Sequence, residues 1–315
     1  MDFFYLQRYV DSEFAKGTAL DSEKVAKEFL QSLQDNYSDA DFEKLLIISG
    51  YIPDLYAADS SEETLYTKLI EALVGEWARR IGATGELIKE KASREDVKIT
   101  IAKKIVVCDA KSFRLGRSQQ APNAKDFLKL EDIRKWMDRY SNSIGGLVTY
   151  PCKHEWKVSS DIYQYCSTKD APTLMLPYKY LALILHYKDN FTDEELLGLW
   201  DYERLFPEKL PKKIQNGNKK LYWQVINAEM IRILKISAKD LADYMSNAET
   251  MIVNCVKANY KVIEEIKAKR VKHIAESVER EVDIEKLKKE IINYKVQAET
   301  SDLDDIMTRM VEWRM

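Results

Sequence analysis

The stretch DVKITIAKKIVVCDAK, residues 96–111, decides how the centre of this chain folds. Apolar residues alternate with polar ones from Val97 to Ile101, which is typical of a strand with one buried face. After the lysines at 103–104 an apolar run over 105–108 begins a second strand. The two strands are therefore predicted to pair across a tight turn.

A turn at Lys103 and Lys104 would place Asp96 opposite Lys111 and diagonal to Asp109, within about 8 Å. Residues two apart on a strand share a face, so the carboxylate of Asp109 and the ammonium of Lys111 point the same way. One divalent cation could then bridge the two carboxylates at the end of a buried strand.

The oxygen atoms of this segment suit a hard cation. The carboxylates of Asp96 and Asp109 and the main-chain carbonyl of Ala110 are ligands that Mg²⁺ accepts while it keeps several waters. Lys111 would hold and polarise an attacking water and offset charge that builds on phosphorus. These residues indicate a chemistry of phosphodiester hydrolysis.

Spacing alone leaves a second interpretation open, because an Asp-x-Lys triplet at a strand end also forms an ordinary structural ion pair. Rival acid-x-Lys triplets occur at 155–157 and 265–267. The second lies in a helical pattern, where residues two apart diverge. The first follows a possible strand, but its nearest well-separated upstream acid falls in an expected helix.

Composition predicts a helical, water-soluble protein. The 315 residues suffice for one large domain or two modest ones, and Gly (10) and Pro (7) are sparse. No apolar run reaches the roughly 20 residues of a membrane span, and the first segment carries acids where a signal peptide is basic. Widely spaced cysteines suit a reducing compartment, so a cytoplasmic location with no membrane partner is expected.

Helical periodicity flanks the two strands. A start signal at Ser60 and Ser61 and a stop at Gly82 bound one helix, and 131–140 reads as a short helix. Residues 144–166 alternate weakly and are expected to supply further strands. The remaining segments predicted to be helical are 1–58, the apolar run Leu174–Tyr187, and nearly everything from 221 onward, where an apolar stripe from Ile252 to Val296 is expected to be core or a dimer seam.

The segment DAKSFRL, residues 109–115, resembles the catalytic block of the HindIII-type restriction endonucleases, a branch of the PD-(D/E)XK nucleases. A thinner similarity covers 60–68 and 180–200. The resemblance implies an α/β fold: a restriction-endonuclease-like core with a small mixed central sheet flanked by helices, plus large helical N- and C-terminal additions. The expected division is a helical N-terminal subdomain at 1–58, a catalytic core at 59–200 and a helical C-terminal region at 201–315 that contacts DNA or forms a dimer.

The resemblance also implies roles for individual residues. Asp96 and Asp109 would bind the metal with the Ala110 carbonyl, and Lys111 would act on the water. An acid on the preceding helix would support the metal site; Glu71 is the candidate, with Glu63 and Glu76 as alternatives. Residues expected to contact DNA are Ser112, Arg114, Arg117 and Lys125. The sequence departs from the family pattern in the long loop from Gly116 to Lys125 and in Glu95-Asp96, which replaces a proline-containing motif.

The activity implied is that of a bacterial type II restriction endonuclease, a Mg²⁺-dependent homodimer that cuts double-stranded DNA at a specific site and leaves 5′-phosphate ends. No Gly-rich phosphate loop is present, so no nucleotide cofactor is expected. Basic stretches at 209–220 and 257–272 could follow a DNA backbone, although the net charge is only −3. Two alternatives stay open: a non-catalytic DNA-binding protein with a nuclease-like fold, and a structure-specific repair or recombination nuclease.

Overall fold

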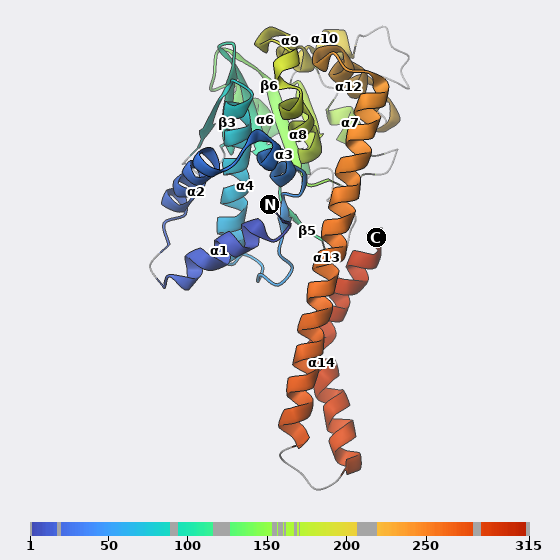
Figure 1. The fold of residues 1–315 in the computed structure, drawn as a ribbon. Helices are drawn as coiled ribbons and strands as arrows, with labels where there is room; N and C mark the ends of the chain where they lie inside the picture. Colours follow the sequence, from blue (N-terminus) through green and yellow to red (C-terminus); the bar gives the residue numbers. More distant parts are fainter. Residues whose placement is uncertain are drawn as a thin grey trace.

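A mixed α/β body carries a long helical hairpin that projects away from it (Figure 1). The computed structural model describes residues 2–17, 20–88, 94–115, 127–152, 156, 160, 162–166, 169, 171–206, 219–279 and 285–312. The helices of the body are α1 (Tyr5–Ala15), α2 (Ser22–Asn36), α3 (Asp39–Ile47), α4 (Ser61–Arg80), α6 (Leu130–Met137), α7 (Ile162–Tyr165), α8 (Tyr178–His186), α9 (Asp193–Leu197), α10 (Tyr202–Leu205) and α12 (Lys219–Leu234), with 3₁₀ turns η1 (Lys188–Asn190) and η2 (Gly198–Trp200).

The central sheet has five strands in the order β2-β3-β4-β6-β7. Strands β4, β6 and β7 are parallel, whereas β2 and β3 run antiparallel to their neighbours. The mixed sheet flanked by helices confirms the predicted fold class. The strands are β2 (Thr84–Leu87), β3 (Val97–Ile101), β4 (Lys104–Ala110), β6 (Ser143–Tyr150) and β7 (Thr173–Pro177), and a separate parallel pair joins β1 (Tyr51–Ile52) to β5 (Phe113–Arg114).

The predicted β3–β4 hairpin is present, but its predicted register is wrong by two residues. Ala102 and Lys103 form the turn with φ values of 44° and 67°, and Val97 pairs with Cys108. Two-residue hairpin turns with positive φ at both positions match the twist of the strands. The Ala-Lys pair carries no glycine or asparagine to mark that turn, which explains why the sequence placed it one residue too late.

The helix predicted over Leu174–Tyr187 is a strand followed by a helix. Residues Thr173–Pro177 form β7, and α8 begins only at Tyr178, after Pro177. A parallel strand buried on both faces is a continuous apolar run, and periodicity cannot distinguish such a run from a buried helix. The strand expected near Ile162 is also wrong, because Ile162–Tyr165 is the short helix α7.

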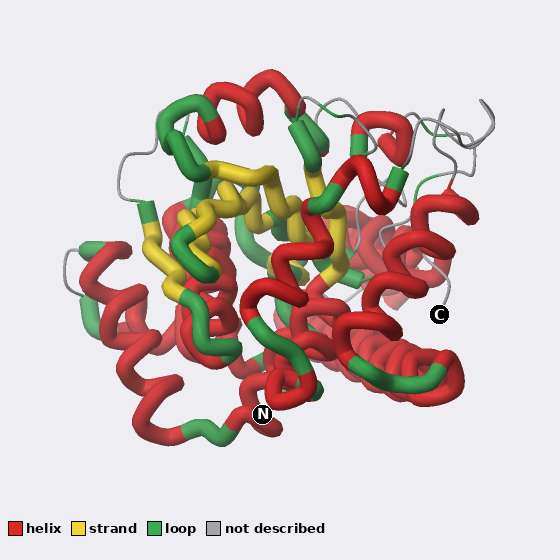
Figure 2. The backbone as a smooth tube through the Cα atoms, turned by 90° about the horizontal axis from the view of Figure 1, so that it is seen from above, coloured by secondary structure: helices red, strands yellow, loops and turns green. Residues whose placement is uncertain are grey.

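Helices pack on both faces of the sheet, as Figure 2 shows from above. Ile133 of α6 lies against Gly146 of β6, while Trp200 lies against Gly145. Neighbouring residues of a strand face opposite sides, so these two contacts are on opposite faces. Helix α4 has the predicted start at the Ser60 cap and contacts β2, β3 and β4.

Helix α4 approaches strand β2 closely because two glycines meet. A Cβ atom added to Gly85 would lie 2.4 Å from the Gly75 carbonyl oxygen, whereas a Cβ on Gly75 would find its nearest neighbour at 3.8 Å. The absence of a side chain at position 85 therefore sets the distance between the helix and the sheet.

We predict that Gly85→Ala lowers the free energy of unfolding by about 1–3 kcal/mol, because the new methyl group overlaps the backbone of α4. The matched control Gly75→Ala should be neutral or stabilising by up to about 1 kcal/mol, since alanine favours a helix and has room there. Urea denaturation measures both. Equal effects of the two substitutions would contradict the packing argument.

The C-terminal region is helical, as predicted. Helix α13 (Ala238–Glu279) is 42 residues long, and α14 (Glu285–Glu312) packs against it. The apolar stripe from Ile252 to Val296 is therefore divided between two helices and forms the seam of a hairpin. None of the described helices is both long enough and apolar enough to cross a membrane.

Candidate active site

The candidate site lies at the C-terminal end of β4, where the parallel strands of the sheet also end. The Lys111 N–H donates to the Thr149 carbonyl of β6 at 2.8 Å, and the Tyr178 hydroxyl of α8 donates to the Lys111 carbonyl at 2.9 Å. Two separate elements thus hold the main chain of Lys111. Ligands of α/β proteins commonly bind at this edge of a parallel sheet.

Asp109 and Lys111 point the same way, as their positions on a strand require. The Lys111 Nζ atom lies 2.7 Å from Asp109 Oδ2. The carboxylate is 12% exposed and the lysine side chain 26%, so the pair borders solvent at the rim of the sheet. A solvent-derived nucleophile can therefore reach the ammonium group.

Asp96 adjoins this pair through an irregularity in the β3–β4 ladder. The Asp96 N–H donates to the Cys108 carbonyl at 2.9 Å, although Cys108 already pairs with Val97. Two residues opposite one form a bulge, a feature that re-aims side chains beside active sites. The Asp96 side chain accepts a hydrogen bond from the Ala110 N–H at 2.8 Å, rather than facing Lys111 as the predicted register required.

The electrostatics of the site show that negative charges are crowded there. Burial raises the pKa of Asp96 well above its usual value, and the charges of Asp109 and Glu71 raise this pKa further. The hydrogen bond from Ala110 and the charge of Lys111 act in the opposite direction. A cation bound between the carboxylates would favour their ionised forms.

The helix acid that acts on this site is Glu71. Its carboxylate lies 2.5 Å from Lys68 Nζ within α4, and Lys68 also donates to the Ile88 carbonyl at 3.4 Å. The influence of Glu71 on the pKa of Asp96 places the two acids within electrostatic range. Lys68 thus supplies a counter-charge for an acid that faces two others.

The alternative acids Glu63 and Glu76 are engaged elsewhere. Glu63 pairs with Arg114 at 2.8 Å. Glu76 is buried and accepts hydrogen bonds from Arg80 at 2.7 Å and Gln34 at 2.9 Å. These contacts join helices of the N-terminal half, which favours Glu71 among the three candidates.

The donor set fits a magnesium ion. The N–H and C=O of one strand residue point to the same side, so the Ala110 carbonyl lies on the side of Asp96. Asp96, Asp109 and this carbonyl supply hard oxygen atoms, and Mg²⁺ commonly takes one or two carboxylates and keeps waters. Among the described residues, no three His, Cys, Asp or Glu side chains gather to form a metal cage. The chain therefore offers an open site rather than a closed structural one.

Comparison with known families identifies the chain. A family model described as HindIII restriction endonuclease matches residues 12–299, nearly the whole length. The chain belongs to the HindIII restriction endonuclease family. No curated protein sequence matches it.

Membership of the HindIII family confirms the resemblance found at residues 109–115. It supports a type II restriction endonuclease, with double-stranded DNA as the partner that the family implies. The match covers every strand of the sheet and all helices from α2 to α13. The helical additions therefore belong to the same family pattern as the catalytic core.

In this HindIII-family chain, Arg114 has a structural environment. Its Nη1 atom donates to the Pro53 and Tyr56 carbonyls at 2.9 and 2.8 Å, and its Nη2 atom lies 2.8 Å from the Glu63 carboxylate. The guanidinium thus fastens β5 to the loop that precedes α4. This geometry favours a role in folding over the DNA contact expected from the sequence.

The other expected DNA contacts have different outcomes. The Ser112 hydroxyl oxygen is buried and has no hydrogen-bond partner among the described residues, which does not favour a direct contact with DNA. Arg117 and Lys125 lie outside the described residues, as do 207–218 of the basic loop and both charged residues of the 155–157 triplet. The 257–272 stretch and the 265–267 triplet lie on α13.

We predict that Arg114→Ala lowers the free energy of unfolding by about 1–3 kcal/mol, because it strands partly buried carbonyls and Glu63. The control Arg8→Ala removes an exposed ion pair with Asp2 and should change stability by less than about 0.5 kcal/mol. Thermal unfolding and DNA binding in Ca²⁺ are measured together. A stable Arg114→Ala protein with weakened DNA binding would restore the DNA-contact hypothesis.

Sequence reasoning recorded Glu95 as a departure from the family pattern but missed its role. Glu95 is only 2% exposed, accepts a hydrogen bond from the Tyr140 hydroxyl, and lies within 3.8 Å of Arg94 and 3.9 Å of Arg139. The residue before Asp96 is thereby fixed to the segment that follows α6. Its position directly after Arg94 in a polar stretch was the available signal.

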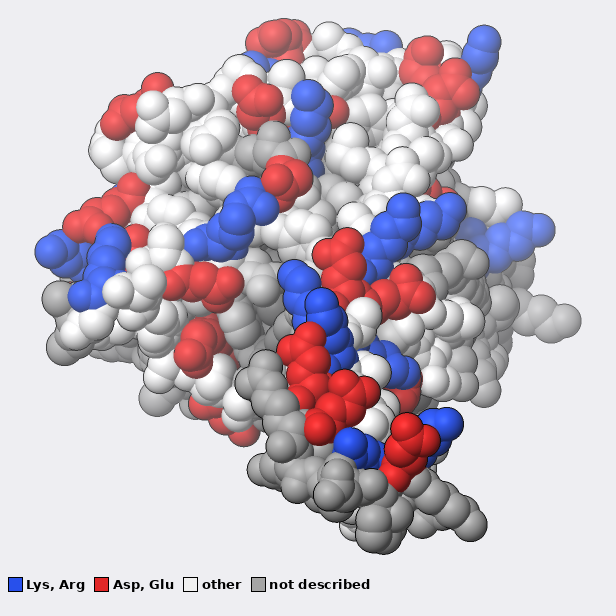
Figure 3. Space-filling view, turned by 60° about the horizontal axis from the view of Figure 1, so that its bottom comes forward, with Lys and Arg blue, Asp and Glu red and all other residues white. Residues whose placement is uncertain are grey.

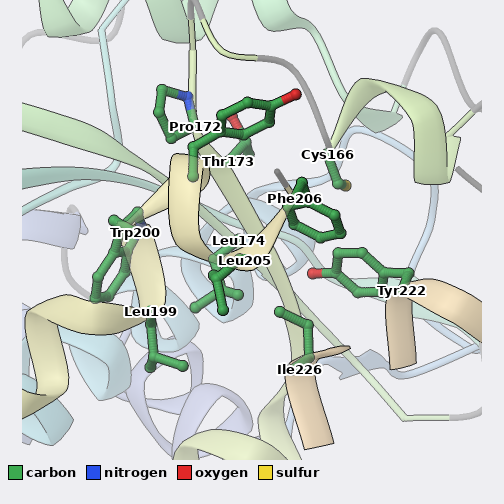
Figure 4. Close-up of a pocket in the computed structure, with 11 residues that line it drawn as sticks. Cys166, Pro172, Thr173, Leu174, Leu199, Trp200, Leu205, Phe206, Tyr222 and Ile226 are labelled. Atoms are coloured by element: carbon green, nitrogen blue, oxygen red, sulfur yellow. The ribbon is translucent and has the colours of Figure 1, made fainter. Parts of the chain in front are cut away.

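A small apolar cavity lies at the other end of the parallel strands and is unrelated to the site (Figure 4). Thr173 and Leu174, at the start of β7, line it together with Trp200, Phe206 and Tyr222. It has room for about one water molecule. Its size and apolar lining suit imperfect core packing rather than a ligand.

Proposed function

We propose that this chain is a Mg²⁺-dependent type II restriction endonuclease that hydrolyses both strands of a specific double-stranded DNA site and leaves 5′-phosphate ends. The observation that carries the proposal is the convergence of Asp96, Asp109 and Lys111 at the end of β4. The family of the chain supplies the independent support.

Asp96, Asp109 and the Ala110 carbonyl would hold the cation. When bound, Mg²⁺ neutralises charge on the scissile phosphate and on the leaving 3′ oxygen. Lys111 keeps an ammonium beside Asp109, where it can orient a water for in-line attack and donate to a phosphate oxygen. The water oxygen bonds to phosphorus as the bond to the 3′ oxygen breaks, so the phosphate stays on the 5′ end.

The site is built so that its catalytic groups need little reorganisation. The backbone of Lys111 is fixed by Thr149 and Tyr178, and Asp96 is fixed by the Ala110 N–H. Preorganised charged groups stabilise developing charge more effectively than groups that must move into place. The same rigidity restricts where a phosphate can sit relative to the nucleophile.

We propose a homodimer as the working form. A two-fold symmetric pair of subunits presents one catalytic site to each strand of a palindromic duplex. The partner molecules are therefore double-stranded DNA and a second copy of the chain, with no nucleotide cofactor.

Asp109→Ala is expected to reduce cleavage below detection, because it removes a metal ligand and the partner of Lys111. Specific DNA binding in Ca²⁺ should persist. Lys111→Ala should retain metal binding and slow cleavage by about 100-fold or more. The control is Lys104→Ala, an exposed lysine at the other end of β4. Single-turnover cleavage of plasmid DNA measures all three variants.

The same assay decides between the alternatives. Discrete fragments with defined termini support a restriction endonuclease. A retarded but intact plasmid band for the wild-type protein would indicate a non-catalytic DNA-binding protein. Cuts that follow DNA structure instead of sequence would indicate a repair or recombination nuclease, and wild-type rates in Asp109→Ala would remove the mechanism.

Glu71→Gln is expected to slow cleavage by about 10- to 100-fold and to raise the Mg²⁺ concentration for half-maximal rate, since it removes a negative charge that acts on Asp96. Glu62→Gln, in the first turn of the same helix, is the matched control and should cleave at the wild-type rate. A Mg²⁺ titration of cleavage rate compares them. If both variants titrate like the wild type, Glu71 does not support the metal site.

A further inference from the structure

The outer side of α14 carries apolar side chains that the chain itself leaves exposed. Four large hydrophobic residues are exposed among the described residues, and three of them lie on this helix: Ile291 at 36%, Tyr294 at 75% and Val311 at 54%. Ile291, Tyr294 and Ala298 follow the spacing i, i+3, i+7, which places them on one side of the helix. We define these three residues as the outer stripe.

The outer stripe is distinct from the seam that α14 already makes with α13. Leu303, Ile306 and Met310 are buried in the hairpin, and Ile292 and Val296 continue that line half-buried toward the tip. At 100° per residue, the outer stripe lies roughly a third of a turn away from this line. The distal part of α14 therefore has two apolar sides, only one of which faces α13.

The position of the hairpin leaves the outer stripe accessible. Figure 1 shows α13 and α14 projecting together beyond the body, with the distal half of α14 far from the sheet. Burying an aromatic side chain such as Tyr294 is favourable, and a fully exposed one beside Ile291 marks an interaction surface when it is rimmed by polar residues. The feature calls for a partner helix.

We propose that the outer stripe pairs with the outer stripe of a second copy of this chain, with the two α14 helices antiparallel. This inference rests on the homodimer of the proposed function and assigns it a surface. The argument for this occupant is charge. Lys288 and Lys295 lie toward the start of the stripe, whereas Asp302 and Asp305 lie beyond its end on the same side of the helix.

An antiparallel pair centred near Ala298 sets the lysines of each copy against the aspartates of the other. Such a surface is self-complementary, as a two-fold interface must be. A parallel pair would place like charges opposite each other. The small Ala298 at the centre allows the two helices to approach closely. Asp302 also lies 3.8 Å from Arg270 of its own chain, so it has a basic neighbour before pairing.

DNA fits this surface less well than a second copy. Figure 3 shows basic and acidic side chains side by side on the side of the molecule where the hairpin comes forward. Aspartates at 302 and 305 within one stripe of Lys288 and Lys295 would repel a phosphate backbone. An apolar strip with Tyr294 at its centre also has no base edge or sugar chemistry to read in a duplex.

The test is the oligomeric state without DNA or metal. We expect the wild-type protein to sediment as a dimer at micromolar concentration and Tyr294→Glu to weaken the dimer at least 100-fold, to a monomer under the same conditions. Leu55→Glu is the matched control, because Leu55 is the remaining exposed large hydrophobe, at 41%, and lies in the body. It should stay dimeric. Circular dichroism and melting check that both variants fold.

A charge exchange tests the antiparallel arrangement itself. Lys288→Glu with Lys295→Glu should weaken the dimer at least 10-fold, and adding Asp302→Lys with Asp305→Lys to the same chain should restore it. A parallel pair or a different surface would show no such rescue. Absence of rescue therefore overturns the proposed geometry.

Three further results would overturn the proposal: a monomeric wild-type protein, a Tyr294→Glu protein as dimeric as Leu55→Glu, or hairpin variants that stay dimeric but lose DNA affinity, which would assign the surface to DNA. Cleavage is measured separately on the wild type. A chain that pairs through α14 but never cuts DNA would refute the nuclease proposal and leave this one standing. A monomer that cuts would do the reverse.

Discussion

The pairing of β3 with β4 is the constraint on which the site depends. Asp96 and Asp109 lie on different strands, so their proximity is set by the register of the hairpin and not by local sequence. Val97, Ile99 and Ile101 are buried on one face and fix that register, because a slip of one residue would turn all three toward the other face. The bulge at Asp96 then aims its carboxylate at the end of β4.

Assembling these acids in one place has an energetic cost that other contacts offset. The pKa of Asp96 is raised because burial and neighbouring negative charge disfavour its ionised form. Lys111 and Lys68 each pair with one of the other acids, and a main-chain N–H bonds to Asp96. Such an arrangement is weak as a source of stability but well suited to receive a cation, a compromise typical of functional sites.

The sequence predicted what depends on periodicity and short motifs. The helix after Ser60, the two strands around residue 103 and the shared face of Asp109 and Lys111 follow from local patterns and are present. The two-residue register error arose because an Ala-Lys turn carries no glycine or asparagine signal. Strand β7 was hidden because residues buried from both sides look alike in a strand and in a helix.

Long-range contacts account for the rest. Arg114 follows the catalytic strand, where a charged residue suits DNA, but its carbonyl partners lie some 60 positions earlier in the chain and no local pattern announces them. The choice among Glu63, Glu71 and Glu76 likewise depends on which neighbour each acid meets. Resemblance narrowed these roles to a few residues, and only tertiary structure separates them.

The contact between Arg114 and Glu63 closes a ring through the protein. From Lys111 the chain runs three residues to Arg114, crosses to Glu63 at the start of α4, follows the helix for two turns to Glu71, and returns electrostatically to Asp96. The lysine and the acids are thus parts of one braced frame and cannot drift independently. Over evolutionary time, a change at either end of the brace should be accompanied by a change at the other, which makes positions 63 and 114 a pair to follow in relatives of this chain.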